Sequence, residues 1–270
     1  QYDPRPFLHV RVGGLSVHPI HDHLRLTAAH YSAYDTRNTP GSRDVTVANP
    51  NGGSVDVSGG TGQDRWRLRD GQPGIEVWGA RNGPGGNGGL TWGTGVVNGQ
   101  GLNDANSDKD LFARVAYKFG GYGELGGGQP PDKPEFWRDD SFKIGAFFYQ
   151  GSSTNTYDGS TLAVDPTDPA GLSEVSVGTT IENDFDLAGL EFDWWFRDLN
   201  FFGLYLRQSD DDPRGTGEAI DTDAWFAEAN YVFYPWLIGV LRYGQTDIDL
   251  SLKTSTDPET QRFLVPAVVF

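Results

Sequence analysis

Residues 192–202 read Phe-Asp-Trp-Trp-Phe-Arg-Asp-Leu-Asn-Phe-Phe, a run that crowds aromatic side chains around one tight turn. Residues 231–236 read Tyr-Val-Phe-Tyr-Pro-Trp and repeat the pattern around a second turn. A sheet in water gains little from exposed rings at its hairpin ends, whereas a sheet that crosses a bilayer places amphipathic rings at the lipid–water boundary. The sequence therefore predicts an aromatic girdle made of Trp194, Phe196, Phe202, Tyr231, Phe233, Tyr234 and Trp236.

Alternating apolar and polar residues predict β-strands along most of the chain, and no segment shows a convincing helical period. Leu111, Val115 and Phe119 share one parity, for example, while Arg114 and Lys118 take the other. The predicted strand cores are residues 7–15, 24–34, 65–80, 89–98, 110–119, 141–150, 186–197, 200–208, 222–234, 236–247 and 261–270. We expect an all-β fold, a transmembrane antiparallel β-barrel with about eleven strands in this sequence and twelve or more in the complete protein.

The composition fits such a barrel better than a helical membrane protein. The mean hydropathy is −0.49 and 37% of the residues are hydrophobic, as expected when one side of each strand meets lipid and the other meets water. No run approaches the roughly 20 consecutive apolar residues that a spanning helix needs. The sequence therefore excludes helical insertion into a membrane.

The connections between the predicted strands alternate in length, which is typical of outer-membrane barrels. The short ones are residues 18–23, 82–88, 198–199 and 234–235, and the long polar ones are residues 36–64, 99–109, 151–180, 209–221 and 248–260. The first predicted strand runs towards a short turn, so we expect a single barrel domain over residues 1–270 that lacks one or more N-terminal strands. Phe270 is either the terminal Phe typical of such barrels or part of an internal strand.

Charge and residue usage exclude several classes of function. The net charge of −16 would repel a phosphate backbone, so we expect no nucleic-acid partner. The absence of cysteine excludes disulfides, thiolate metal sites and thiol nucleophiles. A sequence that starts without an initiator Met or a signal peptide leaves export open.

Charged and amide side chains take the parity opposite to the apolar residues in several predicted strands. We expect them to line a wet lumen that selects permeants by charge and size. The predicted lumen residues are Arg114, Lys118, Lys143, Glu191, Asp193, Arg197, Arg207, Glu228 and Asn230. Paired carboxylates also act in glycosidases, but the lumen interpretation is favoured. No Ser/His/Asp arrangement is expected because every histidine precedes residue 31, and we predict that the protein is not an enzyme.

Three histidines lie in one predicted turn: His18, His21 and His23, next to Asp22. Imidazole and carboxylate groups at this spacing could bind a divalent metal, and a haem-ligand role is a further alternative. A solvated turn is the favoured interpretation. We therefore predict no metal and no cofactor.

Short sequence words carry a resemblance to a known family. They are residues 67–70 (Arg-Leu-Arg-Asp), 74–79 (Gly-Ile-Glu-Val-Trp-Gly), 95–99 (Gly-Val-Val-Asn-Gly), 114–121 (Arg-Val-Ala-Tyr-Lys-Phe-Gly-Gly), 136–141 (Phe-Trp-Arg-Asp-Asp-Ser) and 193–199 (Asp-Trp-Trp-Phe-Arg-Asp-Leu). In this order they resemble a family of bacterial outer-membrane porin-like β-barrels, many of which carry an N-terminal haem segment and are described as cytochrome–porin fusions. The chain has no Cys-x-x-Cys-His, so no haem-ligand role is carried over to any residue.

Taken with the alternation, the resemblance implies a Gram-negative-type envelope protein of the bacterial outer membrane. The expected function is transport, as a porin-like channel for passive diffusion of small solutes or ions. One alternative is a barrel that forms a sheath for a cytochrome, or binds it as a partner, in an electron-transfer complex. A second alternative is a soluble or surface β-rich binding module. The expected partners are membrane lipid and small solutes or ions, with a cytochrome and a second copy of the chain as alternatives.

Overall fold

The computed structural model describes most of the predicted strands. The described residues are 2–5, 8–15, 45–48, 54–57, 72–98, 108–123, 125–128, 138–157, 162–164, 172–174, 179–211, 219–250 and 259–270.

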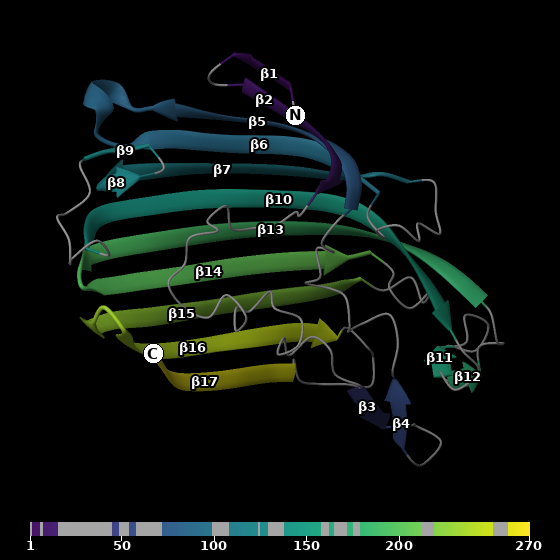
Figure 1. Cartoon of the computed structure of the whole chain (residues 1–270). Coiled ribbons are helices and arrows are strands. Elements are labelled where there is room, and N and C mark those ends of the chain that lie inside the picture. Colours follow the sequence, from purple (N-terminus) through teal and green to yellow (C-terminus); the bar gives the residue numbers. More distant parts are fainter. Residues whose placement is uncertain are drawn as a thin grey trace.

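One antiparallel sheet of eleven strands dominates these residues. Its strands, in spatial order, are β1 (Tyr2–Arg5), β2 (Leu8–Leu15), β5 (Gln72–Asn82), β6 (Gly89–Val97), β7 (Asp110–Gly120), β10 (Asp139–Tyr157), β13 (Thr179–Arg197), β14 (Leu199–Asp210), β15 (Ile220–Tyr234), β16 (Leu237–Leu250) and β17 (Glu259–Val269). Spatial order follows chain order throughout, so the sheet is a meander. Figure 1 shows it as one continuous curved layer, with β1 at the top edge and β17 at the bottom edge.

Smaller elements lie between these strands. Three two-stranded sheets pair β3 (Val45–Ala48) with β4 (Ser54–Val57), β8 (Tyr122–Gly123) with β9 (Gly126–Gly127), and β11 (Leu162–Val164) with β12 (Leu172–Glu174). A short 3₁₀ helix, η3 (Pro84–Gly86), connects β5 to β6. No helix within the described ranges has both the length and the apolar character needed to cross a membrane.

The structure confirms the all-β class and the antiparallel order, but it does not show a closed barrel. Within the described residues β1 and β17 are the two edges of the sheet, and no ladder joins them. The predicted strands at 89–98, 110–119, 141–150, 186–197, 200–208, 222–234, 236–247 and 261–270 are confirmed as strands, 7–15 is confirmed from Leu8 onward, and 65–80 is confirmed from Gln72 onward. The predicted strand at residues 24–34 lies outside the described residues.

Two strands are longer than predicted. β10 and β13 each contain 19 residues and pair from Asp139↔Arg197 to Tyr157↔Thr179. The prediction of a loop over residues 151–180 is therefore wrong at both ends. Residues 152–157 (Ser-Ser-Thr-Asn-Thr-Tyr) lack apolar alternation, and alternation was the signal used to find strands. β10 and β13 stay paired there without apolar alternation, because the backbone N–H and C=O groups of each strand hydrogen-bond to those of the other.

The two faces of the main sheet differ sharply in burial, and the apolar core lies on only one of them. The face called here the buried face carries a cluster of Leu15, Val97, Phe112, Phe147, Tyr149, Leu187, Phe202, Leu204, Leu206, Ala224 and Phe226, each at most 4% exposed. The opposite face, called the exposed face, carries Val12, Ile75, Val96, Leu111, Val115, Phe119, Phe142, Ile144, Phe148, Leu190, Phe192, Trp194, Phe196, Tyr205, Trp225, Tyr231, Phe233, Leu241, Tyr243, Leu264 and Val268, all at least 37% exposed.

Candidate functional site

A row of aromatic side chains crosses four neighbouring strands on the exposed face, near the tight turns. The register pairs Phe119 with Phe142, Phe142 with Trp194, and Trp194 with Phe201. The ring centroids of Phe119 and Phe142 lie 6.3 Å apart, and those of Trp194 and Phe201 lie 5.7 Å apart. Rings at such distances stabilise a sheet by cross-strand packing. This aromatic row continues the residue pattern that first indicated a girdle.

A second aromatic group lies on the exposed face towards the other end of the strands. Tyr205 pairs directly with Trp225, and the rings of Trp225 and Tyr243 lie 5.5 Å apart. The hydroxyl of Tyr205 donates a hydrogen bond to Asp223, so the polar end of this side chain contacts a charged residue rather than the apolar side chains of the exposed face. Tyr and Trp side chains with one apolar and one polar end are typical of membrane interfaces.

Polar residues follow directly beyond this second aromatic group. Gln150 pairs with Asp186, Asp186 with Ser209, and Ser209 with Asp221, so a polar row crosses four strands in register. On β10 the apolar belt lies between Asp140 and Gln150. At about 3.4 Å per residue these ten steps span about 34 Å, which a strand tilt of about 40° reduces to about 26 Å. An apolar band about 25 Å tall is typical of barrels in outer membranes.

The buried face carries charged side chains, and the most enclosed of them is Glu76. Its carboxylate accepts hydrogen bonds from Arg11 on one side and Arg114 on the other, and its side chain is 0% exposed. The three side chains come from β2, β5 and β7. A buried carboxylate is tolerated only when paired in this way, because desolvation of the charge costs several kcal/mol.

A second polar network joins the far half of the same face. Arg242 donates to Glu228 through both Nε, at 2.7 Å, and a terminal nitrogen, and the two side chains are 3% and 2% exposed. Asn230 donates to Glu228 at 2.8 Å and to Asn200 at 3.1 Å. Asn200 in turn donates to Asp193 at 2.5 Å. Carboxylates and amides from β13, β14 and β15 and the guanidinium of Arg242 on β16 therefore form one continuous chain of hydrogen bonds.

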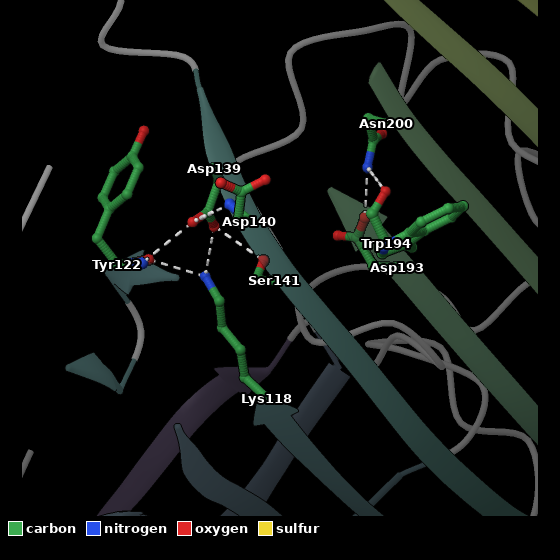
Figure 2. Close-up of polar contacts among 8 residues, drawn as sticks. All are labelled: Lys118, Tyr122, Asp139, Asp140, Ser141, Asp193, Trp194 and Asn200. Atoms are coloured by element: carbon green, nitrogen blue, oxygen red, sulfur yellow. Dashed lines mark hydrogen bonds and ion pairs between the residues drawn. The ribbon is translucent and has the colours of Figure 1, made fainter. Parts of the chain in front are cut away.

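Two lysines complete the charged part of the buried face. The Nζ atom of Lys143 lies 3.7 Å from a carboxylate oxygen of Glu191, and that of Lys118 lies 3.1 Å from Asp139. Figure 2 shows that the carboxylate of Asp139 accepts hydrogen bonds from Lys118, from the backbone N–H of Tyr122 and from the hydroxyl of Ser141. Burial, and secondly the charge of Asp139, raises the pKa of Tyr122 above its ordinary value.

Most of the residues predicted to line a lumen lie together on the buried face. They are Arg114, Lys118, Lys143, Glu191, Asp193, Glu228 and Asn230. Arg207 was placed there wrongly, because its side chain is 58% exposed and pairs with Asp221 on the other face at 3.1 Å. Arg197, the last residue of β13, was also placed there wrongly, because its side chain is exposed and its φ is 55°.

The predicted girdle contains one error as well. Trp194, Phe196, Tyr231, Phe233, Tyr234 and Trp236 are exposed, but Phe202 is only 2% exposed and packs against Phe226 at a centroid distance of 5.2 Å. The two errors on β14, Phe202 and Arg207, have one cause. The two-residue turn after Phe196 pairs Phe196 with Leu199, and this register directs the odd residues of β14 to the exposed face. The apolar residues Phe202, Leu204 and Leu206 of β14 thus belong to the buried core.

The sequence interpretation missed several residues of the polar networks: Arg11, Glu76, Asp139, Asn200 and Arg242. Glu76 and Arg242 each stand between two apolar neighbours, so the alternation used elsewhere contained the signal for both. Residues 18, 21 and 23, the candidate metal-binding histidines, lie outside the described residues. Within the described ranges no group of three or more His, Cys, Asp or Glu side chains is arranged to hold a metal ion. No protein-family model and no curated protein sequence matches the chain.

Proposed function

We propose that the eleven-stranded sheet is the wall of a transmembrane β-barrel in a bacterial outer membrane, and that the barrel is a porin-like channel for passive diffusion of small solutes or ions. The observation that carries the proposal is the inverted distribution of side chains. Charged residues such as Glu76, Glu228 and Arg242 are buried, whereas large apolar residues of the same strands are exposed.

In water both halves of this distribution are unfavourable. A contiguous apolar belt on the surface loses the hydrophobic stabilisation of about 25 cal/mol per Å² that burial would give. In a bilayer the apolar belt is solvated by lipid tails, and the charged face is enclosed by the barrel. A membrane also requires that the sheet have no free edge, so we propose that further pairing at β1 and β17 closes it.

The charges on the buried face support the channel part of the proposal. Lysine and arginine groups pair with carboxylates on this face from β2 to β16, and rings of such charges select ions in membrane pores. In a planar lipid bilayer we expect the purified, folded protein to produce stepwise conductance. Insertion without any conductance, shown by protection of the strands from protease in the same preparation, would contradict the channel.

Replacing Lys118 with glutamine should shift the selectivity of this conductance towards cations. Lys118 is the most exposed lysine of the charged face, with 16% of its side chain exposed, and it lies next to Asp139 near the tight turns. Removing its positive charge leaves an excess of negative charge along the path. The reversal potential in a salt gradient measures the change. Lys109→Gln is the matched control, since Lys109 is exposed and precedes β7 at the opposite end, and an equal shift in both variants would count against a path along the buried face.

One observation favours a second function. The inward-directed side chains of β13 to β16 are almost all less than 9% exposed, and they include an apolar band made of Leu187, Leu204, Leu206, Ala224 and Phe226. A barrel whose interior is closed by its own side chains also suits the alternative of a barrel that binds a partner such as a cytochrome. That function predicts haem absorbance in the native complex and no conductance by the isolated protein, so the two measurements separate the candidates.

A further inference from the structure

A polar cavity lies at the end of the sheet where the tight turns are found. Its volume is about 520 Å³, within the range of small-molecule sites. The lining residues come from four separate segments and are Asn87, Gly121, Tyr122, Gly128, Arg138, Asp139, Asp140, Arg197 and Asp198. Of its lining residues Asp139 also belongs to the charged part of the buried face, through its ion pair with Lys118, so the cavity lies at the margin of that face.

Most charges in the cavity are already neutralised by a neighbour. Arg138 donates two hydrogen bonds to Asp198, at 2.7 and 3.0 Å. The carboxylate of Asp139 accepts a hydrogen bond from Lys118, as Figure 2 shows, and another from the hydroxyl of Ser141 at 2.8 Å. These pairs hold the walls of the cavity in place and leave little charge for a ligand.

Arg197 and Asp140 are the exception. Both are exposed, and the backbone N–H of Arg197 donates to Oδ1 of Asp140 at 3.3 Å, which holds the two residues side by side. The guanidinium of Arg197 lies over the ring of Phe196, 5.6 Å from its centroid. Among the described residues no carboxylate forms an ion pair with that guanidinium. The cavity therefore presents one cation and one carboxylate with unused hydrogen-bonding capacity.

The backbone at Arg197 supports a functional role for this pair. Its φ of 55° lies in the left-handed region, which a glycine would adopt without strain. A non-glycine residue in this region costs on the order of 1 kcal/mol or more, and such strain is concentrated at functional sites. The turn therefore retains an arginine where glycine would be more stable.

The location of the pair identifies the ligand. Asp140 pairs in register with Phe196, and the next exposed-face residue of β10 is Phe142, at the start of the apolar belt. We propose that the cavity binds the headgroup of a zwitterionic phospholipid, with its phosphate on Arg197, its ammonium on Asp140 and its acyl chains along Phe142 and Phe196. This inference rests on the proposed membrane location, because only in a bilayer do these rings meet lipid.

The test uses the full chain in detergent micelles and native mass spectrometry, with a short-chain phosphatidylethanolamine as probe. Phosphatidylglycerol with the same chains and inorganic phosphate serve as comparison ligands. We expect saturable binding of the phosphatidylethanolamine and at least about tenfold weaker binding to Arg197→Gly, since that variant removes charge-assisted hydrogen bonds without disturbing the turn. Asp140→Asn should abolish the preference for phosphatidylethanolamine over phosphatidylglycerol. Arg207→Gln, which changes an exposed arginine near the opposite polar row, should bind as the unmodified chain does.

Three results would overturn the inference: equal binding of both lipids by the unmodified chain, unchanged binding by Arg197→Gly, or displacement of the lipid by inorganic phosphate at a similar concentration, which would indicate a simple anion site. Insertion into vesicles is measured separately for each protein. A chain that inserts but shows no headgroup preference contradicts only this inference, whereas a chain that does not insert contradicts the proposed function itself.

Discussion

Ile144→Arg is expected to destabilise the folded protein in a bilayer by about 2–4 kcal/mol, because an arginine at the midplane of a barrel's lipid face costs about that much. Ile144 is 49% exposed and lies between Phe142 and Phe148 in the apolar belt of β10. It pairs with Tyr117 and Phe192, which are also on the exposed face. Reversible unfolding by denaturant in phospholipid vesicles, followed by tryptophan fluorescence, measures the free energy.

Gln150→Arg is the matched control, since Gln150 is an exposed residue of the same strand that lies in the polar row at the boundary of the belt. Near an interface the cost of an arginine falls to about 0–1 kcal/mol. A water-exposed sheet gives a different result, because a surface substitution away from special features changes stability by no more than about 0.5 kcal/mol. Equal and small effects at both positions would therefore favour the alternative of a soluble or surface binding module.

The sequence was sufficient to predict most of the strands and, for many residues, the face of the sheet on which the side chain lies. Alternation in β7, β10 and β13 correctly separated Phe119, Ile144 and Trp194 from Arg114 and Lys143, because apolar and charged residues alternate in the parts of these strands nearest the tight turns. The same rule failed for β14. Its apolar residues Phe202, Leu204 and Leu206 fill the core, while Arg207 and Ser209 point to the other face near the polar row. Only the register set by the turn after Phe196 resolves that choice.

The polar networks could not be predicted from any single strand. Glu76 is held by Arg11, which its own strand partner β2 supplies, and by Arg114, which lies two strands away on β7. Both contacts depend on the pairing register between β2, β5, β6 and β7. The alternation of residues within one strand does not define that register. Glu76 on β5 and Arg114 on β7 meet over Gly93 of the intervening strand β6. A Cβ at Gly93 would lie 3.1 Å from Arg114 Nε and 3.2 Å from a carboxylate oxygen of Glu76. A glycine in a predicted strand was therefore a sequence signal for this close approach.

Arg242→Met is expected to cost about 3–5 kcal/mol, because it leaves the carboxylate of Glu228 buried without its cation. Glu228 is 2% exposed and receives two hydrogen bonds from Arg242, and Asn230 supplies one more at 2.8 Å. A single amide donor does not compensate for a missing guanidinium. Unfolding in the same vesicles gives the free energy. Arg262→Met on β17 is a control, since Arg262 is exposed and its Nε donates only to Gln245, at 3.1 Å.

The double variant Glu228→Gln/Arg242→Met separates pairing from packing. Once residue 228 is neutral, its amide can still accept from Asn230 and no buried charge remains at either substituted position, so we expect the double variant to recover most of the stability lost by Arg242→Met alone. The coupling free energy between the two sites should then be about 2 kcal/mol or more, since the residues share one buried network. Additive losses would mean that Arg242 acts mainly by packing over the ring of Phe226, 5.0 Å from its centroid. In that case the ion pair between Glu228 and Arg242 would contribute little to the stability of the sheet.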